Sequence, residues 1–113
     1  MDKLPYQAYV SLLSGRFEWD PDKDHRNKAK HGVEFSRAQR AFDDPLRVFI
    51  EDHKHSTPAE RRYFCMGRVD GGVLMVRFTC RNLVVRIFGA GYWSIGRRIY
   101  EKRNQIHAGP ERR

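Results

Sequence analysis

Polar and apolar residues follow two different periods along the chain, and the change comes near residue 45. Before it the pattern is helical, and the segment Pro21–His31 has signals for both of its ends. Asp20 is a favoured N-cap residue, a proline suits the first helical position, and Gly32 suits a left-handed C-cap. The interior of this segment is almost entirely polar, so we expect either a solvated helix or one whose side chains line a site.

A second helix is predicted from the capping-box spacing of Ser36 and Gln39, and it should run to about Phe42. Residues 1–16 precede both helices and read as a separate leader. For this leader the sequence allows either a docked helix or a frayed arm.

Beyond residue 45 the period changes to the alternation typical of strands. Strands are expected at 47–51, 61–68, 73–81 and 83–88, with hairpin turns at Asp70-Gly71 and Arg81-Asn82. A final helix is expected from Ser94 to about Gln105. The order predicts an α+β domain: an antiparallel four-stranded sheet with two N-terminal helices and one C-terminal helix, all on one side.

The two predicted turns fix a strand register, which sorts the side chains between the faces of the sheet. One face is apolar and offers a bed for helices: Tyr63, Cys65, Val76, Phe78, Val85 and Ile87. The other face carries Arg62, Phe64, Arg77, Thr79 and Arg86. In this register Arg77 lies directly opposite Arg86, which is unfavourable unless an anion binds between them. A carboxylate such as Glu60 or Glu101 that reached between the two arginines would relieve the repulsion equally well.

We interpret this second face as a phosphate-binding surface, with Phe64 available to stack on a base. The alternative is an exposed sheet face on which long arginine stems cover apolar area. A register slip by one residue would exchange the two faces.

Charge is concentrated in the second half of the chain. The net charge is +8, from 22 Lys and Arg against 14 Asp and Glu. Residues 61–113 hold 12 basic residues against three acidic ones, a net of +9, and eleven of the 12 are arginine. Arginine presents a planar fork suited to phosphate oxygens. A polyanion, most simply a nucleic acid, is therefore the expected partner, and a basic surface without a specific ligand is the alternative.

Composition narrows the class of protein further. The length of 113 residues fits one domain, which we place at 17–105, between the leader and a C-terminal tail at 106–113. No apolar run approaches the roughly 18 residues of a membrane span, so no membrane partner is expected. Two cysteines do not make a disulfide framework, and a reducing cytoplasm is the expected location.

A series of short segments between Phe17 and Arg103 is distinctive as a set. They are Phe17-Glu18-Trp19-Asp20-Pro21, Lys23, Asn27, Lys30-His31-Gly32-Val33, Phe42-Asp43-Asp44-Pro45, Glu60-Arg61-Arg62-Tyr63, Gly67, Thr79-Cys80-Arg81, Val85-Arg86-Ile87 and Arg98-Ile99-Tyr100-Glu101. The series resembles the BrnT family, the ribonuclease toxins of bacterial type II toxin–antitoxin pairs. The resemblance implies a RelE-like fold, an RNA substrate and a BrnA-like antitoxin, with operator DNA contacted only through the antitoxin complex.

The chain departs from the family pattern at two places. Phe88-Gly89-Ala90-Gly91-Tyr92-Trp93 stands where many members have Ile-Ser-Ala-Arg, and Phe78 stands where many have a histidine. The first departure removes an arginine from the rim of the expected site. Tyr92 or Trp93 offers a stacking surface in its place.

The resemblance implies metal-independent endoribonuclease activity that needs no cofactor and inhibits translation. Attack by the ribose 2′-hydroxyl requires a base, an acid and cations for the phosphorane. Arg62 and Arg86 are the expected catalytic cations, and His31 of the Lys-His-Gly motif is the candidate base, unless it only offsets a helix dipole. Tyr100 either donates a proton or packs its ring on the sheet. The residues expected to bind RNA are Lys30, Phe64, Arg77, Arg81, Tyr92, Arg97 and Arg98.

Two other classes of function stay open at this point. One is a binding module of the same fold, without catalysis, for nucleic acid or protein. The other is a metal site in Asp52-His53-Lys54-His55, where alternating histidines point the same way on an extended segment. A solvated loop is the commoner outcome for such a segment, and we assign no metal ligands.

Overall fold

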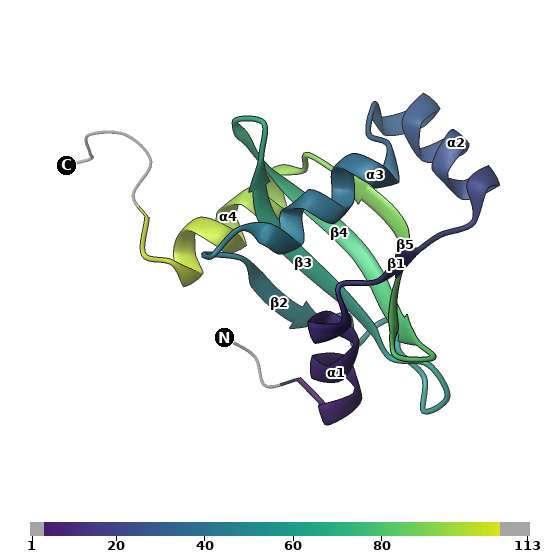
Figure 1. Cartoon of the computed structure of the whole chain (residues 1–113). Helices are drawn as coiled ribbons and strands as arrows, with labels where there is room; N and C mark the ends of the chain where they lie inside the picture. Colours follow the sequence, from purple (N-terminus) through teal and green to yellow (C-terminus); the bar gives the residue numbers. More distant parts are fainter. Residues whose placement is uncertain (1–3, 107–113) are drawn as a thin grey trace.

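The computed structural model describes residues 4–106 as one mixed sheet with helices on both faces (Figure 1). In chain order the elements are α1 (Tyr6–Ser14), β1 (Phe17–Glu18), α2 (Pro21–His31), α3 (Phe35–Ala38), the 3-10 helix η1 (Gln39–Asp43), β2 (Val48–Glu51), β3 (Arg62–Val69), β4 (Gly72–Arg81), β5 (Val84–Gly91) and α4 (Ser94–Arg103). The expected α+β class is confirmed. Among the described helices none is both long and apolar enough to cross a membrane.

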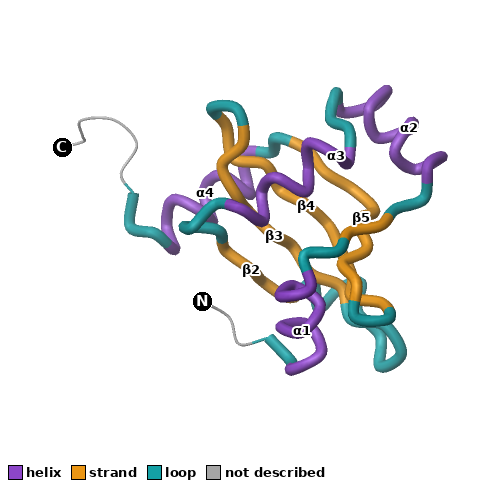
Figure 2. The backbone as a smooth tube through the Cα atoms, viewed as in Figure 1, coloured by secondary structure: helices purple, strands orange, loops and turns teal. Residues whose placement is uncertain are grey.

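The sheet has five strands in the order β1-β5-β4-β3-β2, so the expected four-stranded antiparallel sheet is wrong at one edge (Figure 2). The added strand, β1, pairs parallel with β5, with Phe17 opposite Val85 and Glu18 opposite Arg86. Two residues carry no readable periodicity, and their partners lie 68 residues further along the chain. No local pattern therefore indicates this strand.

The helices are divided between the two faces, whereas the sequence placed them all on one. Helices α1 and α3 and η1 pack on one face, and α4 packs on the other (Figure 1). All six residues expected on the apolar face are buried together in the first core. The second, smaller core lies under α4 and contains Val48, Met66, Val73, Met75 and Tyr100.

Helix α2 has the predicted bounds and caps. The Asp20 carboxylate accepts a hydrogen bond from the Asp22 N–H at 2.9 Å, and Gly32 adopts a left-handed φ of 73°. The helix is attached to β5 by the buried Asn27, whose amide donates to the carbonyls of Val33 and Ala90 and accepts from the Ala90 N–H. A polar side chain, rather than an apolar stripe, therefore holds this helix.

The second helix begins earlier than predicted, and its capping box does not form. Glu34 is the N-cap of α3, without a side-chain cap, and the 3-10 helix η1 follows from Gln39. The free N–H of Phe35 is satisfied instead by the carboxylate of Asp24 in α2, at 2.8 Å. A contact with another helix has replaced the local cap.

Within the leader, the described residues 4–16 include a docked helix. Leu4, Ala8 and Ser11 of this segment are buried against the sheet, while Tyr6 and Leu13 face solvent. The expected tail at 106–113 lies outside the described residues apart from Ile106, which packs with the α4 core.

The first predicted hairpin is confirmed, and the second is displaced by one turn residue. Tyr63 pairs with Phe78 around Asp70-Gly71, whereas β4 and β5 turn at Asn82-Leu83, both with positive φ. Thr79 therefore lies opposite Arg86, and Arg77 lies opposite Gly89. From Phe78 to Arg81 the pairing moves by two residues, so these side chains keep their predicted faces. At Arg77 a bulge adds one more residue, and the predicted Arg77–Arg86 pair is wrong.

Candidate functional site

Helix α4 covers only part of its face of the sheet. The part under the helix carries Met66 and Met75. Further along the same strands, the uncovered part carries side chains from β3, β4 and β5. We call it the arginine face, and it consists of Arg62, Arg77, Arg86 and Phe88. Thr79 lies buried between them, and Phe64 lies at the border with the α4 core.

Two guanidinium groups of the arginine face converge on one aromatic ring. The Cζ atom of Arg62 lies 4.7 Å from the centroid of the Phe88 ring, and that of Arg77 lies 5.1 Å from it. Attraction to the ring partly offsets the repulsion between the two cations. Both guanidinium groups are thus held at the same ring, and each carries donors suited to phosphate oxygens.

A bulge in β5 places Phe88 between these arginines. Phe78 pairs with Ile87 and Arg77 pairs with Gly89, so Phe88 has no partner of its own in β4. A side chain at Gly89 would put its Cβ atom 3.1 Å from the Cδ atom of Arg77. Glycine at this position leaves space for the arginine stem.

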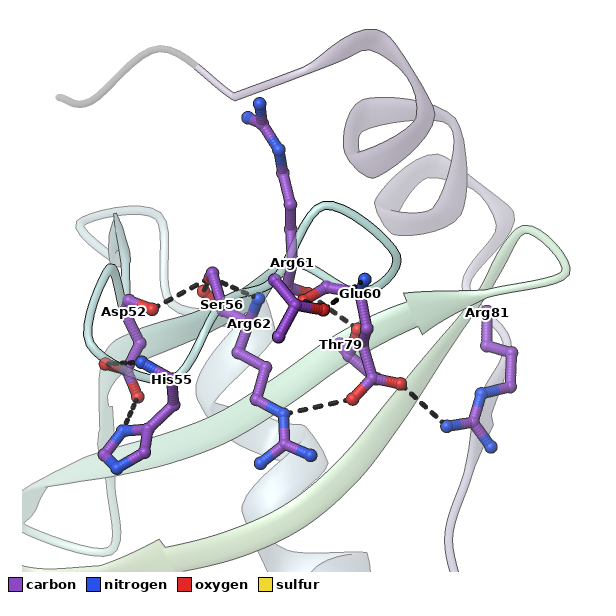
Figure 3. A network of polar contacts seen from close by, with 9 residues as sticks. Asp52, His55, Ser56, Glu60, Arg61, Arg62, Thr79 and Arg81 are labelled. Atoms are coloured by element: carbon purple, nitrogen blue, oxygen red, sulfur yellow. Dashed lines mark hydrogen bonds and ion pairs between the residues drawn. The ribbon is translucent and has the colours of Figure 1, made fainter.

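Two carboxylates orient guanidinium groups of this region. Glu60 bonds Arg62 through Nε at 3.0 Å and Arg81 through Nη2 at 2.8 Å (Figure 3). The bonds from Arg81 and Arg62 lower the pKa of Glu60, although partial burial opposes them. Glu18 of β1 bonds Arg86 at 3.0 Å. The expected carboxylate Glu60 is thus present, and the unexpected strand β1 supplies the second.

The arginine face and its neighbour Arg81 keep an excess of positive charge. Four arginines and two carboxylates leave a net of +2 (4 − 2). Within the part of the chain that the structure describes, no carboxylate lies within ion-pair distance of Arg77. Its guanidinium is available to a ligand without displacing a protein anion.

The loop after β2 lies beside Arg62 and holds a histidine on a buried carboxylate. The Nδ1 atom of His55 is 2.8 Å from Oδ2 of Asp52, whose side chain is 8% exposed. The Asp52 N–H donates to the Arg62 carbonyl at 2.8 Å. Ser56 Oγ accepts from the Arg62 N–H at 2.8 Å and donates to the Asp52 carbonyl. Figure 3 shows the His55 ring and the Arg62 guanidinium extending to the same side of β3.

The two histidines of this loop contact different carboxylates. His53 lies 3.8 Å from Glu51, while His55 is bonded to Asp52. Over residues 4–106, no three side chains of His, Cys, Asp or Glu gather as metal ligands would. The loop therefore offers an oriented imidazole rather than a pair of convergent ligands.

The structure places the candidate base His31 and the candidate acid Tyr100 away from these groups. His31 is exposed at the end of α2, with its ring edge-on to Trp93 at 5.1 Å. Tyr100 is buried under α4 and donates from its hydroxyl to Asp44 at 2.6 Å. Burial and this bond raise the pKa of Tyr100. For Asp44, bonds from Tyr100 and backbone N–H groups overcome the effect of burial and lower the pKa.

The residues expected to bind RNA fall into two groups. Phe64 and Arg77 lie on the arginine face, and Arg81 joins it through Glu60. The others lie on separate elements: Lys30 on α2, Arg97 and Arg98 on α4, and Tyr92 after β5. The Tyr92 hydroxyl donates to the Val69 carbonyl at 3.0 Å, beside the β3–β4 turn.

Three features of the site were not assigned from sequence. Phe88 was read only as part of a departure from the family pattern, because a bulge is not visible in the sequence. Glu18 reaches the site through a non-local pairing. His55 was considered only as a metal ligand, although its spacing of three from Asp52 was a usable signal for a bonded pair.

A family model described as the ribonuclease toxin BrnT of type II toxin–antitoxin systems matches residues 19–95. The match covers 77 of 113 positions (95 − 19 + 1), including the whole arginine face and the Asp52–His55 loop, but not α1 or Glu18. No curated protein matches the chain.

Proposed function

The chain belongs to the BrnT family of ribonuclease toxins, and we propose that its arginine face binds RNA and positions one phosphodiester for cleavage. Membership makes the chain a ribonuclease toxin of a type II pair, with an antitoxin as partner. The observation that carries the proposal is the convergence of Arg62 and Arg77 on the Phe88 ring. A surface that holds two guanidinium groups at one ring is suited to an anion with several oxygens.

The proposed reaction is attack of a ribose 2′-hydroxyl on the adjacent phosphorus, without a metal. Its transition state carries more negative charge on the phosphate oxygens than the ground state does, and fixed donors lower the barrier. Arg62 is bonded to Glu60 through Nε, so its two terminal NH2 groups are left to face the substrate. Arg77 adds a second fork, and Arg86 is held by Glu18 at the β1 side.

This chemistry specifies the products. The 2′-oxygen forms a bond to phosphorus as the bond to the 5′-oxygen breaks, which gives a 2′,3′-cyclic phosphate and a free 5′-hydroxyl. A strand that lacks the 2′-hydroxyl at the cut position should resist. Cleavage of messenger RNA by this route inhibits translation, and the antitoxin holds the toxin inactive and carries the complex to operator DNA.

The test is cleavage of a labelled RNA by the purified chain in excess chelator, beside its 2′-deoxy analogue. We expect cleavage of the RNA alone, and a loss of about 100-fold or more for Arg77→Ala, the effect typical of removing one transition-state donor. Arg26→Ala removes an equal charge from the exposed surface of α2 and should cleave as the wild type does.

Two results would reject the proposal. Binding of RNA by the wild type without cleavage would make the arginine face a docking surface. Equal cleavage by Arg77→Ala and the wild type would remove this face from the reaction.

A further inference from the structure

We infer that His55, oriented by Asp52, is the general base that takes the proton from the attacking 2′-hydroxyl. The inference rests on the proposed ribonuclease function and names a residue for the general base, a role that the arginine face leaves unfilled. Arginine stays protonated in proteins and supplies cations, so the base must come from outside the arginine face.

The bond between His55 and Asp52 fixes which nitrogen can act. Nδ1 faces a carboxylate oxygen at 2.8 Å, and a carboxylate only accepts hydrogen bonds, so the neutral ring carries its proton on Nδ1. The other nitrogen, Nε2, then has a free lone pair. The His55 side chain is 47% exposed, which leaves that nitrogen open to a substrate. A histidine oriented by a carboxylate in this way is a recurrent design for a base.

The carboxylate of Asp52 is unusual in being almost fully covered. Its side chain is 8% exposed, and its two oxygens are both engaged by His55, Oδ2 by the ring and Oδ1 by the backbone N–H at 3.3 Å. A buried carboxylate is costly unless it is paired. The two bonds to His55 offset this cost, and they fix the orientation of its ring.

The loop ties the imidazole to the arginine face. Asp52 and Ser56 bond the two backbone groups of Arg62, so the loop and the start of β3 move as one unit. Figure 3 shows the ring and the guanidinium on the same side of the strand. A phosphate held by Arg62 and Arg77 thus brings its ribose toward Nε2. His31 has no such placement, since its ring contacts Trp93 at the start of α4.

The step balances without a further reactant other than water. Nε2 of His55 takes the proton of the 2′-hydroxyl while the oxygen attacks phosphorus. The bond from phosphorus to the 5′-oxygen breaks, and that oxygen takes a proton from water. The imidazolium then returns its proton to solvent, and Asp52 stabilises the imidazolium while it exists.

The experiment compares two histidines of the same loop. We expect His55→Ala to reduce the rate of RNA cleavage by about 10²- to 10⁴-fold, the usual contribution of a general base, with RNA binding unchanged. His53→Ala, two positions away and paired with Glu51 rather than Asp52, should cleave at the wild-type rate. Added imidazole should restore part of the activity of His55→Ala and leave His53→Ala unaffected.

A second variant separates catalysis from loop structure. His55→Asn keeps a donor for Asp52 but has no basic nitrogen, so it should be folded, bind RNA and be as inactive as His55→Ala. Cleavage by His55→Asn within about threefold of the wild type, or no response of His55→Ala to imidazole, would overturn the inference. Either result leaves the proposed function intact if the wild type cleaves, whereas an inactive wild type rejects both.

Discussion

Gly67 shows how a single position sets the distance between two layers of the fold. It lies in the middle of β3, where η1 crosses the sheet. A Cβ atom at this position would meet Ala41, at 2.8 Å from its carbonyl carbon and 2.9 Å from its Cα atom. The obstacle is the backbone of the fully buried Ala41, which has no rotamer through which to move away. Only glycine allows this approach.

Substitution of Gly67 by alanine should therefore destabilise the protein by about 1–3 kcal/mol, the usual cost of overpacking a core. Gly91→Ala is the comparison, because its Cβ would meet side-chain atoms of the Trp93 ring, at 2.6 Å from Cε2. A side chain can rotate away where backbone cannot, so Gly91→Ala should cost less. Urea denaturation of the two variants measures both effects, and an equal or reversed order would contradict the argument.

At the residue scale, the sequence predicted the cations of the site but not what holds them. Arg62, Arg77 and Arg86 share a face because strand alternation survives a displacement of two residues. Phe88 enters through a bulge and Glu18 through a two-residue strand, and neither has a local signature. Side chains that depend on periodicity are thus predictable, and those that depend on an irregular or distant pairing are not.

At the scale of elements, helix ends test which local signals the fold uses. Asp20→Ala should cost about 1 kcal/mol, since its carboxylate satisfies an N–H of the first turn of α2. Ser36→Ala should change the free energy of unfolding by less than about 0.5 kcal/mol, because Ser36 is exposed and is not the N-cap of α3. Thermal or urea unfolding measures both free energies. A large loss of stability in Ser36→Ala would mean that the predicted capping box does form.

The contrast between local caps and contacts with distant segments also explains which elements were predictable. The bounds of α2 follow from caps within its own segment. The second turn needs positive φ at both central residues, and the structure uses Asn82 and Leu83 for them. Leucine is a rare choice there, so the sequence favoured the pair one position earlier. The placement of α4 on the opposite face depends on the whole sheet and carries no signal in α4 itself.

At the scale of the whole molecule, the two faces of the sheet have separate tasks. One face is packed against α1, α3 and η1 and forms the first core, the main core of the protein. The other is closed by α4 at one end only, which leaves the arginine face beside the Asp52–His55 loop. One side of these strands thus stabilises the fold, and the other carries the proposed chemistry. Substitutions on the arginine face should therefore change cleavage with little effect on the free energy of unfolding.

The main core also contains groups that must stay protonated for the protein to fold. Burial raises the pKa of Tyr63 to about 12, and it raises the pKa of the Cys65 and Cys80 thiols. The unfolded chain loses these protons at the ordinary, lower values. Above those values the folded state binds more protons than the unfolded state, so the free energy of unfolding decreases as the pH rises.

We therefore expect stability to be level near pH 7–8, to decline as the pH passes the ordinary range of a thiol at about 8.5, and to decline further from about 10 toward 12 as tyrosine contributes. Tyr63→Phe should flatten the upper part of this decline, because phenylalanine fills the same space and has no proton to lose. Urea denaturation at pH 8, 9.5 and 11, in reductant and followed by the fluorescence of Trp19 and Trp93, measures the effect. If Tyr63→Phe loses stability as steeply as the wild type between pH 10 and 12, the buried hydroxyl does not couple folding to pH.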